Sequence, residues 1–137
     1  MITVLVADDH SFMRATLVDL FAESDDITVV ATCADGTEVV PAALRTDPDV
    51  VLMDVGMGEV TGLEAARALL QVRPDARVLM LSGSLSGAAV REAVSLGVRG
   101  FLLKGDDPAL LTERIREVAA GGSAWSPATE GYLPAPG

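Results

Sequence analysis

Residues 49–58 read DVVLMDVGMG. Four apolar residues, Val50 to Met53, lead directly into the acid Asp54, and the loop after this acid contains two glycines. An apolar run without alternating polar residues predicts a strand that is covered on both faces, as in a parallel sheet. Such a strand delivers the carboxylate of Asp54 to its carboxyl end, which is the edge where open α/β sheets bind ligands.

Four similar apolar runs occur elsewhere, at residues 3–7, 27–31, 77–81 and 100–103. The segments between them have helical spacing of apolar residues, with N-caps predicted at Ser11 and at Asp107 before Pro108, and a C-terminal glycine at Gly97. Strands that alternate with helices five times predict βαβ units with right-handed crossovers. The predicted fold class is therefore α/β, with a doubly wound parallel sheet of five strands in the common order 2-1-3-4-5.

Composition limits the class of protein. The chain has 137 residues, half of them hydrophobic, which is enough for the core of one domain. The formal net charge of −10 repels nucleic-acid phosphates, so we expect the chain alone not to bind DNA. A single cysteine excludes an internal disulfide, and no apolar run approaches the roughly 18 residues of a membrane span. We expect a cytoplasmic protein without membrane contact.

The end of the chain differs from the rest. Residues 122–137 read GSAWSPATEGYLPAPG and are rich in Pro, Gly, Ser and Ala. This composition predicts a flexible linker or C-terminal tail after a folded domain of residues 1–121.

Polar side chains follow four of the five predicted strands, at Asp8 and Asp9, Asp54, Ser82 and Lys104. Because the first and third strands are neighbours in the predicted order, three carboxylates should meet beside a hydroxyl and an ammonium. Crowded carboxylates repel one another unless a hard cation such as Mg²⁺ neutralises them. Each side chain alone is more often a cap or surface residue, but the joint pattern indicates phosphoryl transfer to a carboxylate.

Four segments carry a resemblance to a known family: VLVADDHSFMR (4–14), PDVVLMDVGMGEVTGLEAAR (48–67), RVLMLSGS (77–84) and GVRGFLLKGD (97–106). In order and spacing, the chain from about residue 2 to 120 resembles the receiver domain of bacterial two-component response regulators. The DDH sequence and the GFLLKGD sequence most resemble the LuxR/NarL-type branch. The resemblance implies a flavodoxin-like, CheY-like (βα)5 fold.

The resemblance also implies roles for individual residues. Asp54 matches the phosphoacceptor. The metal, Mg²⁺ with Mn²⁺ as a substitute, would be bound directly by Asp9, Asp54 and the backbone carbonyl of Gly56, and through water by Asp8. The phosphate-contacting and switch residues implied by the resemblance are Ser82, Lys104 and Phe101. His10 is interpreted as a loop residue, because the acids already account for the metal.

The function implied by the resemblance is a phosphorylation-controlled switch. A sensor histidine kinase would donate the phosphoryl group, and the face formed by the fourth helix, fifth strand and fifth helix would change shape. The chain is expected to catalyse only its own phosphorylation and dephosphorylation. Transcription would be controlled through a LuxR-type helix-turn-helix domain of a longer parent protein, and DNA would be bound only there. A natural single-domain regulator is the alternative, and the surface of a phosphorylation-linked homodimer stays open.

Two other functions compete with this interpretation. A degenerate receiver would bind partners without phosphorylation, and Gly58 and Gly105, which replace prolines common in the family, keep this alternative open. A haloacid-dehalogenase-like phosphatase would need an acid two residues after Asp54, where the chain has Gly56. Gly56 and Ser84 are also small beside the phosphoryl position, and we hypothesise that they change the lifetime of the phosphorylated form.

Overall fold

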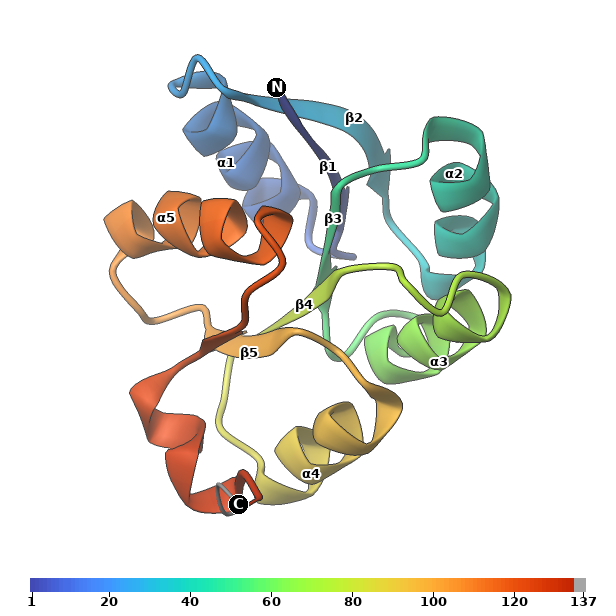
Figure 1. Ribbon diagram of the computed structural model, residues 1–137. Coiled ribbons are helices and arrows are strands. Elements are labelled where there is room, and N and C mark those ends of the chain that lie inside the picture. Colours follow the sequence, from blue (N-terminus) through green and yellow to red (C-terminus); the bar gives the residue numbers. More distant parts are fainter. Residues whose placement is uncertain (135–137) are drawn as a thin grey trace.

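Figure 1 shows the computed structural model, which describes residues 1–134. All strands of its six-stranded sheet are parallel, in the order β2-β1-β3-β4-β5-β6. The strands are β1 (Ile2–Ala7), β2 (Ile27–Cys33), β3 (Val50–Asp54), β4 (Val78–Ser82), β5 (Gly100–Leu103) and β6 (Ala124–Trp125). The helices are α1 (Ser11–Ala22), α2 (Val39–Thr46), α3 (Gly62–Val72), α4 (Gly87–Leu96) and α5 (Pro108–Ala119), with 3-10 helices η1 (Gly36–Glu38) and η2 (Pro127–Tyr132).

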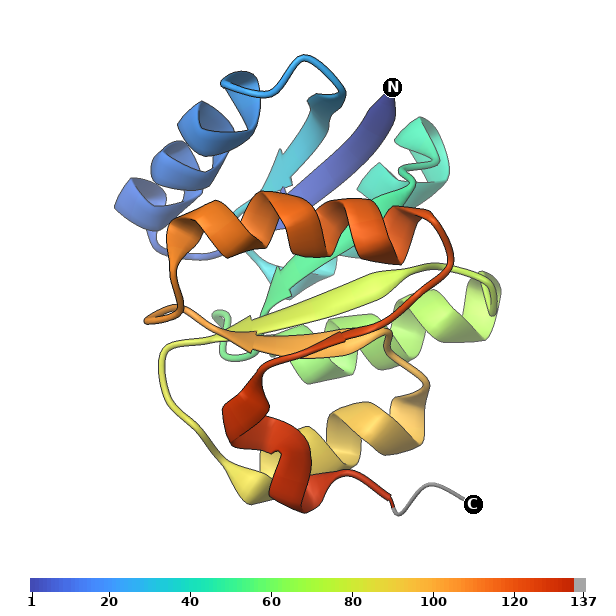
Figure 2. The ribbon, with the colours of Figure 1, turned by 60° about the vertical axis from the view of Figure 1, so that its left-hand side comes forward.

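The helices cover both faces of the sheet. Helices α1 and α5 lie on one face, and α2, α3 and α4 lie on the other (Figures 1 and 2). Each face has its own core: Phe21 and Ile115 are fully buried on the first, and Met53 and Leu69 on the second. Full burial of one such side chain stabilises the fold by roughly 1.5–3 kcal/mol, which explains why the strands are apolar on both faces. The α/β class and the order 2-1-3-4-5 are confirmed.

The predicted helix ends are largely correct. The carboxylate of Asp107 accepts a hydrogen bond from the amide of Ala109, with Pro108 as the first helical residue, and Gly97 ends α4 in a left-handed conformation with φ 88°. The prediction for α1 is displaced by one residue. Ser11 is the first residue of the helix and His10 is the N-cap, because the His10 backbone is still extended.

The C-terminal segment corrects the prediction of a linker without structure. Ala124 and Trp125 pair with β5, and residues 127–132 form η2. Ala124, Ser126 and Thr129 are buried, and the Thr129 hydroxyl donates to the carbonyl oxygen of Ser126 at 2.6 Å. These contacts satisfy backbone groups that a free edge of the sheet would leave unpaired. Residues 135–137 of the predicted tail lie outside the described part of the chain.

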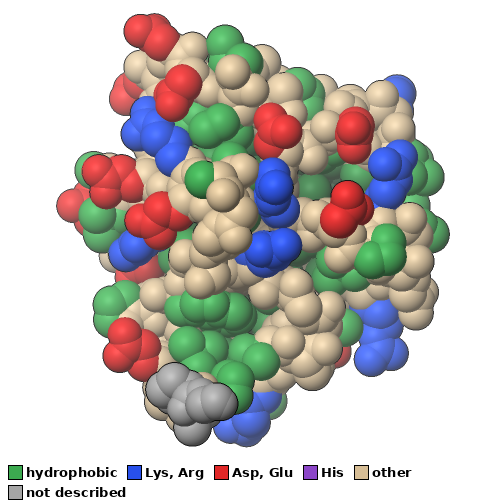
Figure 3. All heavy atoms as spheres, in the orientation of Figure 1, with side chains coloured by type: hydrophobic (Ala, Val, Ile, Leu, Met, Phe, Trp, Pro, Cys, Tyr) green, Lys and Arg blue, Asp and Glu red, His purple; other side chains and the backbone are tan. Residues whose placement is uncertain are grey.

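The exposed surface carries both signs of charge. Figure 3 shows acidic and basic side chains interspersed over the face seen in Figure 1. None of the helices within residues 1–134 combines the length and the apolar character needed to cross a bilayer.

Candidate functional site

The site lies at the carboxyl ends of four parallel strands. Asp8 and Asp9 follow β1, Asp54 and Ser82 end β3 and β4, and Lys104 follows β5. The register of the strands fixes how far along the strand direction each of these residues lies. Ala7 pairs with Met53, Asp54 with Leu81 and Ser82 with Leu103. The structure thus brings the predicted carboxylates and the lysine together at one edge of the sheet.

Lys104 joins two of the carboxylates. Its Nζ atom lies 2.9 Å from Asp8 Oδ2 and 3.2 Å from Asp54 Oδ1. The Asp8 and Asp54 side chains are only 1% and 6% exposed, whereas that of Lys104 is 15% exposed. The amide of Lys104 donates to the carbonyl oxygen of Ser82 at 2.7 Å, which holds the start of this side chain at the end of β4. The ammonium is therefore placed by the sheet itself and bridges the ends of β1 and β3.

The charges at the site shift two pKa values. Burial, together with the nearby charge of Asp8, raises the pKa of Asp54, and Lys104 offsets only part of this rise. Burial lowers the pKa of Lys104, but its hydrogen bonds and charge interactions with Asp8 and Asp54 outweigh burial and leave it raised. The crowding of negative charge is therefore only partly neutralised by the protein's own ammonium.

This charge excess fits a divalent cation. Ligand atoms of Asp8, Asp9, His10 and Asp54 all lie within 4.8 Å of one another. Carboxylate oxygens are the ligands that Mg²⁺ prefers, and Asp9 is more exposed than Asp8 and Asp54, so it faces the side from which an ion enters. The residues fit the predicted metal. The contribution of the Gly56 carbonyl stays a prediction from the family resemblance.

His10, predicted to be a loop residue outside the site, lies against two of its carboxylates. Its Nδ1 atom lies 3.2 Å from Asp8 Oδ1 and 3.1 Å from Asp9 Oδ1, and its backbone amide donates to Asp8 Oδ1 at 2.9 Å. The imidazole is 67% exposed, so it forms the outer wall of the acidic cluster. The sequence did carry a signal for this position, because His10 directly follows the two acids. Arg14 donates to the backbone carbonyl of Asp8 at 2.7 Å and anchors the same turn.

The two predicted switch residues, Ser82 and Phe101, each have a single side-chain orientation in the structure. The Ser82 hydroxyl donates to the backbone carbonyl of Ser84 at 2.7 Å, which directs it along its own loop. Phe101 is fully buried and belongs to the core between the sheet and α4. The aromatic ring is thus already directed inward in this structure, and the predicted switch roles of both residues stay predictions.

Glycine allows the loop from β3 to α3 to pass close to the backbone of Asp54. The amide of Gly62 donates to the Val55 carbonyl at 2.8 Å, and a Cβ atom at Gly62 would collide with the backbone carbonyl of Asp54. Gly58 has φ +25°, and a Cβ atom there would meet the carboxylate of Asp35. Proline cannot adopt a positive φ, so the glycine at position 58 suits the path of this loop.

Comparison with known proteins identifies the class. The response regulator receiver domain family matches residues 4–116, a range that includes every site residue described above. The chain therefore belongs to the response regulator receiver domains, which act in phosphorylation signalling.

The relatives are regulators of the NarL/LuxR type. The chain is 34% identical over 130 residues to the nitrate/nitrite response regulator protein NarP of Escherichia coli, covering 95% of this chain and 60% of that protein. It is 36% identical over 118 residues to a nitrate/nitrite response regulator homolog of Haemophilus influenzae, covering 86% of this chain and 57% of the relative. The chain thus spans less than two thirds of these relatives' length.

Solved structures agree with this assignment. A LuxR-family two-component response regulator from Aurantimonas sp. SI85-9A1 superposes with a TM-score of 0.90 at 31% identity, over 95% of this chain and 93% of that one. The signal receiver domain of NarL from Mycobacterium tuberculosis gives a TM-score of 0.83 at 30% identity, over 88% and 97% of the two chains. The predicted family and its LuxR/NarL-type branch are confirmed.

Proposed function

We propose that Asp54 accepts a phosphoryl group from a sensor histidine kinase and that the phosphorylated domain controls an output. The observation that carries this proposal is the position of the Asp54 carboxylate. It ends β3, lies 3.2 Å from the Lys104 ammonium, and shares a 4.8 Å cluster with two further carboxylates. A buried nucleophile beside a fixed cation, at an edge open to solvent through Asp9, is suited to an in-line attack on phosphorus.

The chain's own residues have distinct tasks in this reaction. An Asp54 oxygen forms the new bond to phosphorus as the bond to the donor breaks, and Lys104 pairs with one equatorial oxygen. Asp9, Asp54 and the backbone carbonyl of Gly56 would hold Mg²⁺ directly and Asp8 through water, with Mn²⁺ as a substitute. When bound, the cation spreads the charge of the transferring group. Asp54 reacts in its ionised form, which the nearby charges of Asp8 and Asp9 oppose and the Lys104 ammonium favours.

The output is the finer part of the proposal. We propose that phosphorylation draws Ser82 toward the added oxygens and keeps Phe101 inward, which changes the α4-β5-α5 face. The relatives named above are longer than this chain, so we place control of transcription in a LuxR-type helix-turn-helix domain of the parent protein. The acidic receiver itself would not contact DNA, and its catalysis would be limited to its own phosphorylation and dephosphorylation. A cytoplasmic location stays a prediction.

Intact-mass spectrometry after incubation with Mg²⁺ and acetyl phosphate tests this function. We expect one phosphoryl adduct, which is absent in Asp54→Asn and in the presence of a chelator. Asp25→Asn is the matched control, because Asp25 is an exposed acid in the turn before β2, at the amino ends of the strands and opposite the site, and it should keep the adduct. A folded wild-type protein that binds Mg²⁺ but takes up no phosphoryl group, even from a panel of histidine kinases, would favour the degenerate interaction module.

A further inference from the structure

Residues 123–133, which we call the tail cover, lie along the edge of the sheet beside the predicted output face. In the parallel pairing of β5 with β6, Gly100 is opposite Ala124 and Phe101 is opposite Trp125. The Ala124 amide donates to the Arg99 carbonyl, and the Ser126 amide donates to the Phe101 carbonyl, both at 2.9 Å. The tail cover is therefore bonded directly to the strand that carries Phe101.

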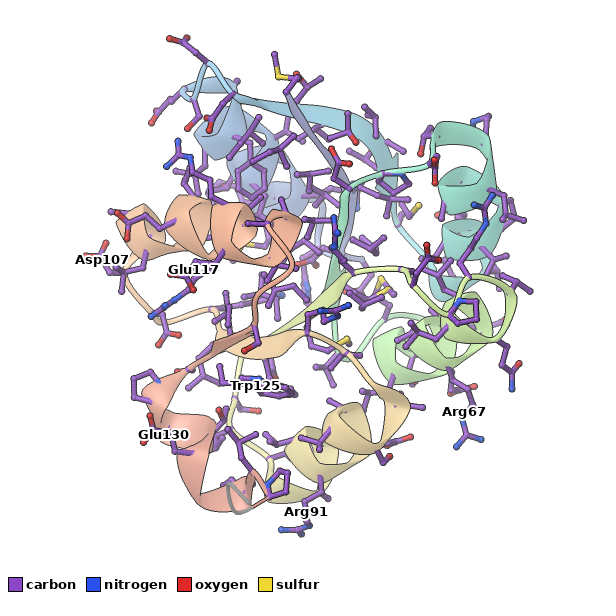
Figure 4. All side chains as sticks on the ribbon, viewed as in Figure 1. Arg67, Arg91, Asp107, Glu117, Trp125 and Glu130 are labelled. Carbon is purple, nitrogen blue, oxygen red and sulfur yellow. The ribbon has the colours of Figure 1, made fainter. Side chains whose placement is uncertain are left out.

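The other end of the tail cover rests on α4. The ring of Tyr132 packs where Gly87 has no side chain, so that a Cβ atom at Gly87 would collide with it. The guanidinium carbon of Arg91 lies 5.6 Å from the centre of the same ring, a cation–π distance. Figure 4 shows Arg91 on α4 at the end of the molecule where the tail cover ends. The tail cover thus spans from the edge of β5 to the first turns of α4.

Trp125 lies next to the switch aromatic. Residues opposite each other in parallel strands direct their side chains to the same face of the sheet, so Trp125 and Phe101 are neighbours on the α4 side. Trp125 packs against the core that contains Phe101 and Val90 of α4. Figure 3 shows apolar side chains gathered at the surface between the tail cover and α4, and Figure 4 places Trp125 between β5 and α4. An outward movement of Phe101 along this edge would have to displace Trp125.

We propose that the tail cover holds Phe101 inward and is energetically coupled to the phosphoryl state of Asp54. The coupling rests on the function proposed above, in which phosphorylation also favours the inward ring. Two events that favour the same conformation reinforce each other, and this reinforcement is reciprocal. Phosphorylation of Asp54 tightens the tail cover, and the docked tail cover favours the phosphorylated form. A partner that binds the edge of β5 together with α4 must first displace residues 123–133.

The first experiment needs no phosphoryl donor. The three phenylalanines are labelled with fluorophenylalanine, and the Phe101 resonance is followed by fluorine NMR. Ala124→Pro removes the N–H that bonds to Arg99, whereas the matched control Ala124→Gly keeps it. We expect the Phe101 resonance to shift and broaden in Ala124→Pro but not in Ala124→Gly. An unchanged resonance in both variants would overturn the proposal.

A second variant protects this test against misfolding. Tyr132 is 37% exposed, so Tyr132→Ala removes the contact with α4 without opening the core. It should shift the Phe101 resonance in the same direction as Ala124→Pro. Where Ala124→Pro does not fold, a Tyr132→Ala variant with a wild-type Phe101 resonance would equally overturn the proposal.

The second experiment measures the coupling. Amide hydrogen exchange at Ala124 and Ser126 is compared before and after phosphorylation with acetyl phosphate, with the adduct verified by intact mass. We expect exchange at both amides to slow by about fivefold or more. A verified phosphorylated form with unchanged exchange would refute the coupling. If no adduct forms from acetyl phosphate or from a panel of histidine kinases, the proposed function fails instead, and the fluorine experiment still decides whether the tail cover holds Phe101.

Discussion

Replacement of Gly62 by alanine should disrupt the site from its backbone side. Gly62 is the first residue of α3, and an ideal Cβ atom there would overlap the carbonyl oxygen of Asp54. Because this obstacle is backbone of the central strand β3, it cannot rotate away as the end of a side chain could. Overpacking of this kind costs about 1–3 kcal/mol or more. The helix gains at most about 1 kcal/mol from the loss of a glycine.

We therefore expect Gly62→Ala to lower the free energy of unfolding by about 2 kcal/mol, after this gain is subtracted from the upper part of that range. For a domain of this size, such a loss lowers Tm by roughly 6–10 °C. Urea unfolding of the wild type and of Gly62→Ala, fitted with one shared m-value, measures the difference in the free energy of unfolding. Phosphorylation from acetyl phosphate should fall as well, since the carbonyl that must move belongs to the phosphoacceptor.

Gly56→Ala is the matched control for this prediction. A Cβ atom at Gly56 meets open space, so the same added methyl group should change stability by less than about 0.5 kcal/mol. Equal free energies of unfolding for the two variants would refute the steric reasoning. A Gly62→Ala variant as stable as the wild type would show that β3 and α3 separate more easily than their packing indicates.

Three further predictions concern the chemistry of the site. Because the folded-state pKa of Asp54 is raised above its unfolded value of 3.8, this residue contributes stability below that pH and loses it as the pH rises through the folded pKa. In chelator, the Tm of the wild type should therefore fall relative to the Tm of Asp54→Asn as the pH rises, and added Mg²⁺ should reduce this fall. A difference in Tm that does not depend on pH would contradict the prediction. Lys104→Met should raise the pKa of Asp54 further, as followed by carboxyl carbon NMR, and slow phosphorylation about a hundredfold; an unchanged rate would remove Lys104 from the reaction. Gly56→Asn should change the decay rate of phosphorylated Asp54, measured by intact mass over time, and equal rates would contradict the lifetime hypothesis.

The positions of the main site residues followed from local sequence patterns. Apolar runs without alternation specify buried parallel strands, and in such a sheet the residue after each strand reaches the same edge. Asp8, Asp54 and Lys104 could therefore be placed together from the sequence. The caps at Asp107 and Gly97 followed in the same way, because each depends on a few consecutive residues.

The contacts between these residues could not be predicted in the same way. That Lys104 bridges Asp8 and Asp54, and that His10 lies on two carboxylates, depends on side-chain directions set by packing across the sheet. The direction of the Ser82 hydroxyl along its own loop has the same origin.

The tail cover shows the difference between local and tertiary information. Two strand residues, Ala124 and Trp125, are too few for a hydrophobic period, and the surrounding Pro and Gly residues favour a linker by composition. Only folding places the carbonyls of Arg99, just before β5, and Phe101, within β5, where Ala124 and Ser126 can bond to them, and only the folded α4 presents Gly87 to the ring of Tyr132. Local patterns in the sequence were enough to predict the first five strands and the acids at their ends, because both depend on neighbours along the chain; the strand order was predicted from its frequency among doubly wound sheets. The tertiary structure alone decided what covers the edge of β5, because that depends on groups brought together from distant parts of the chain.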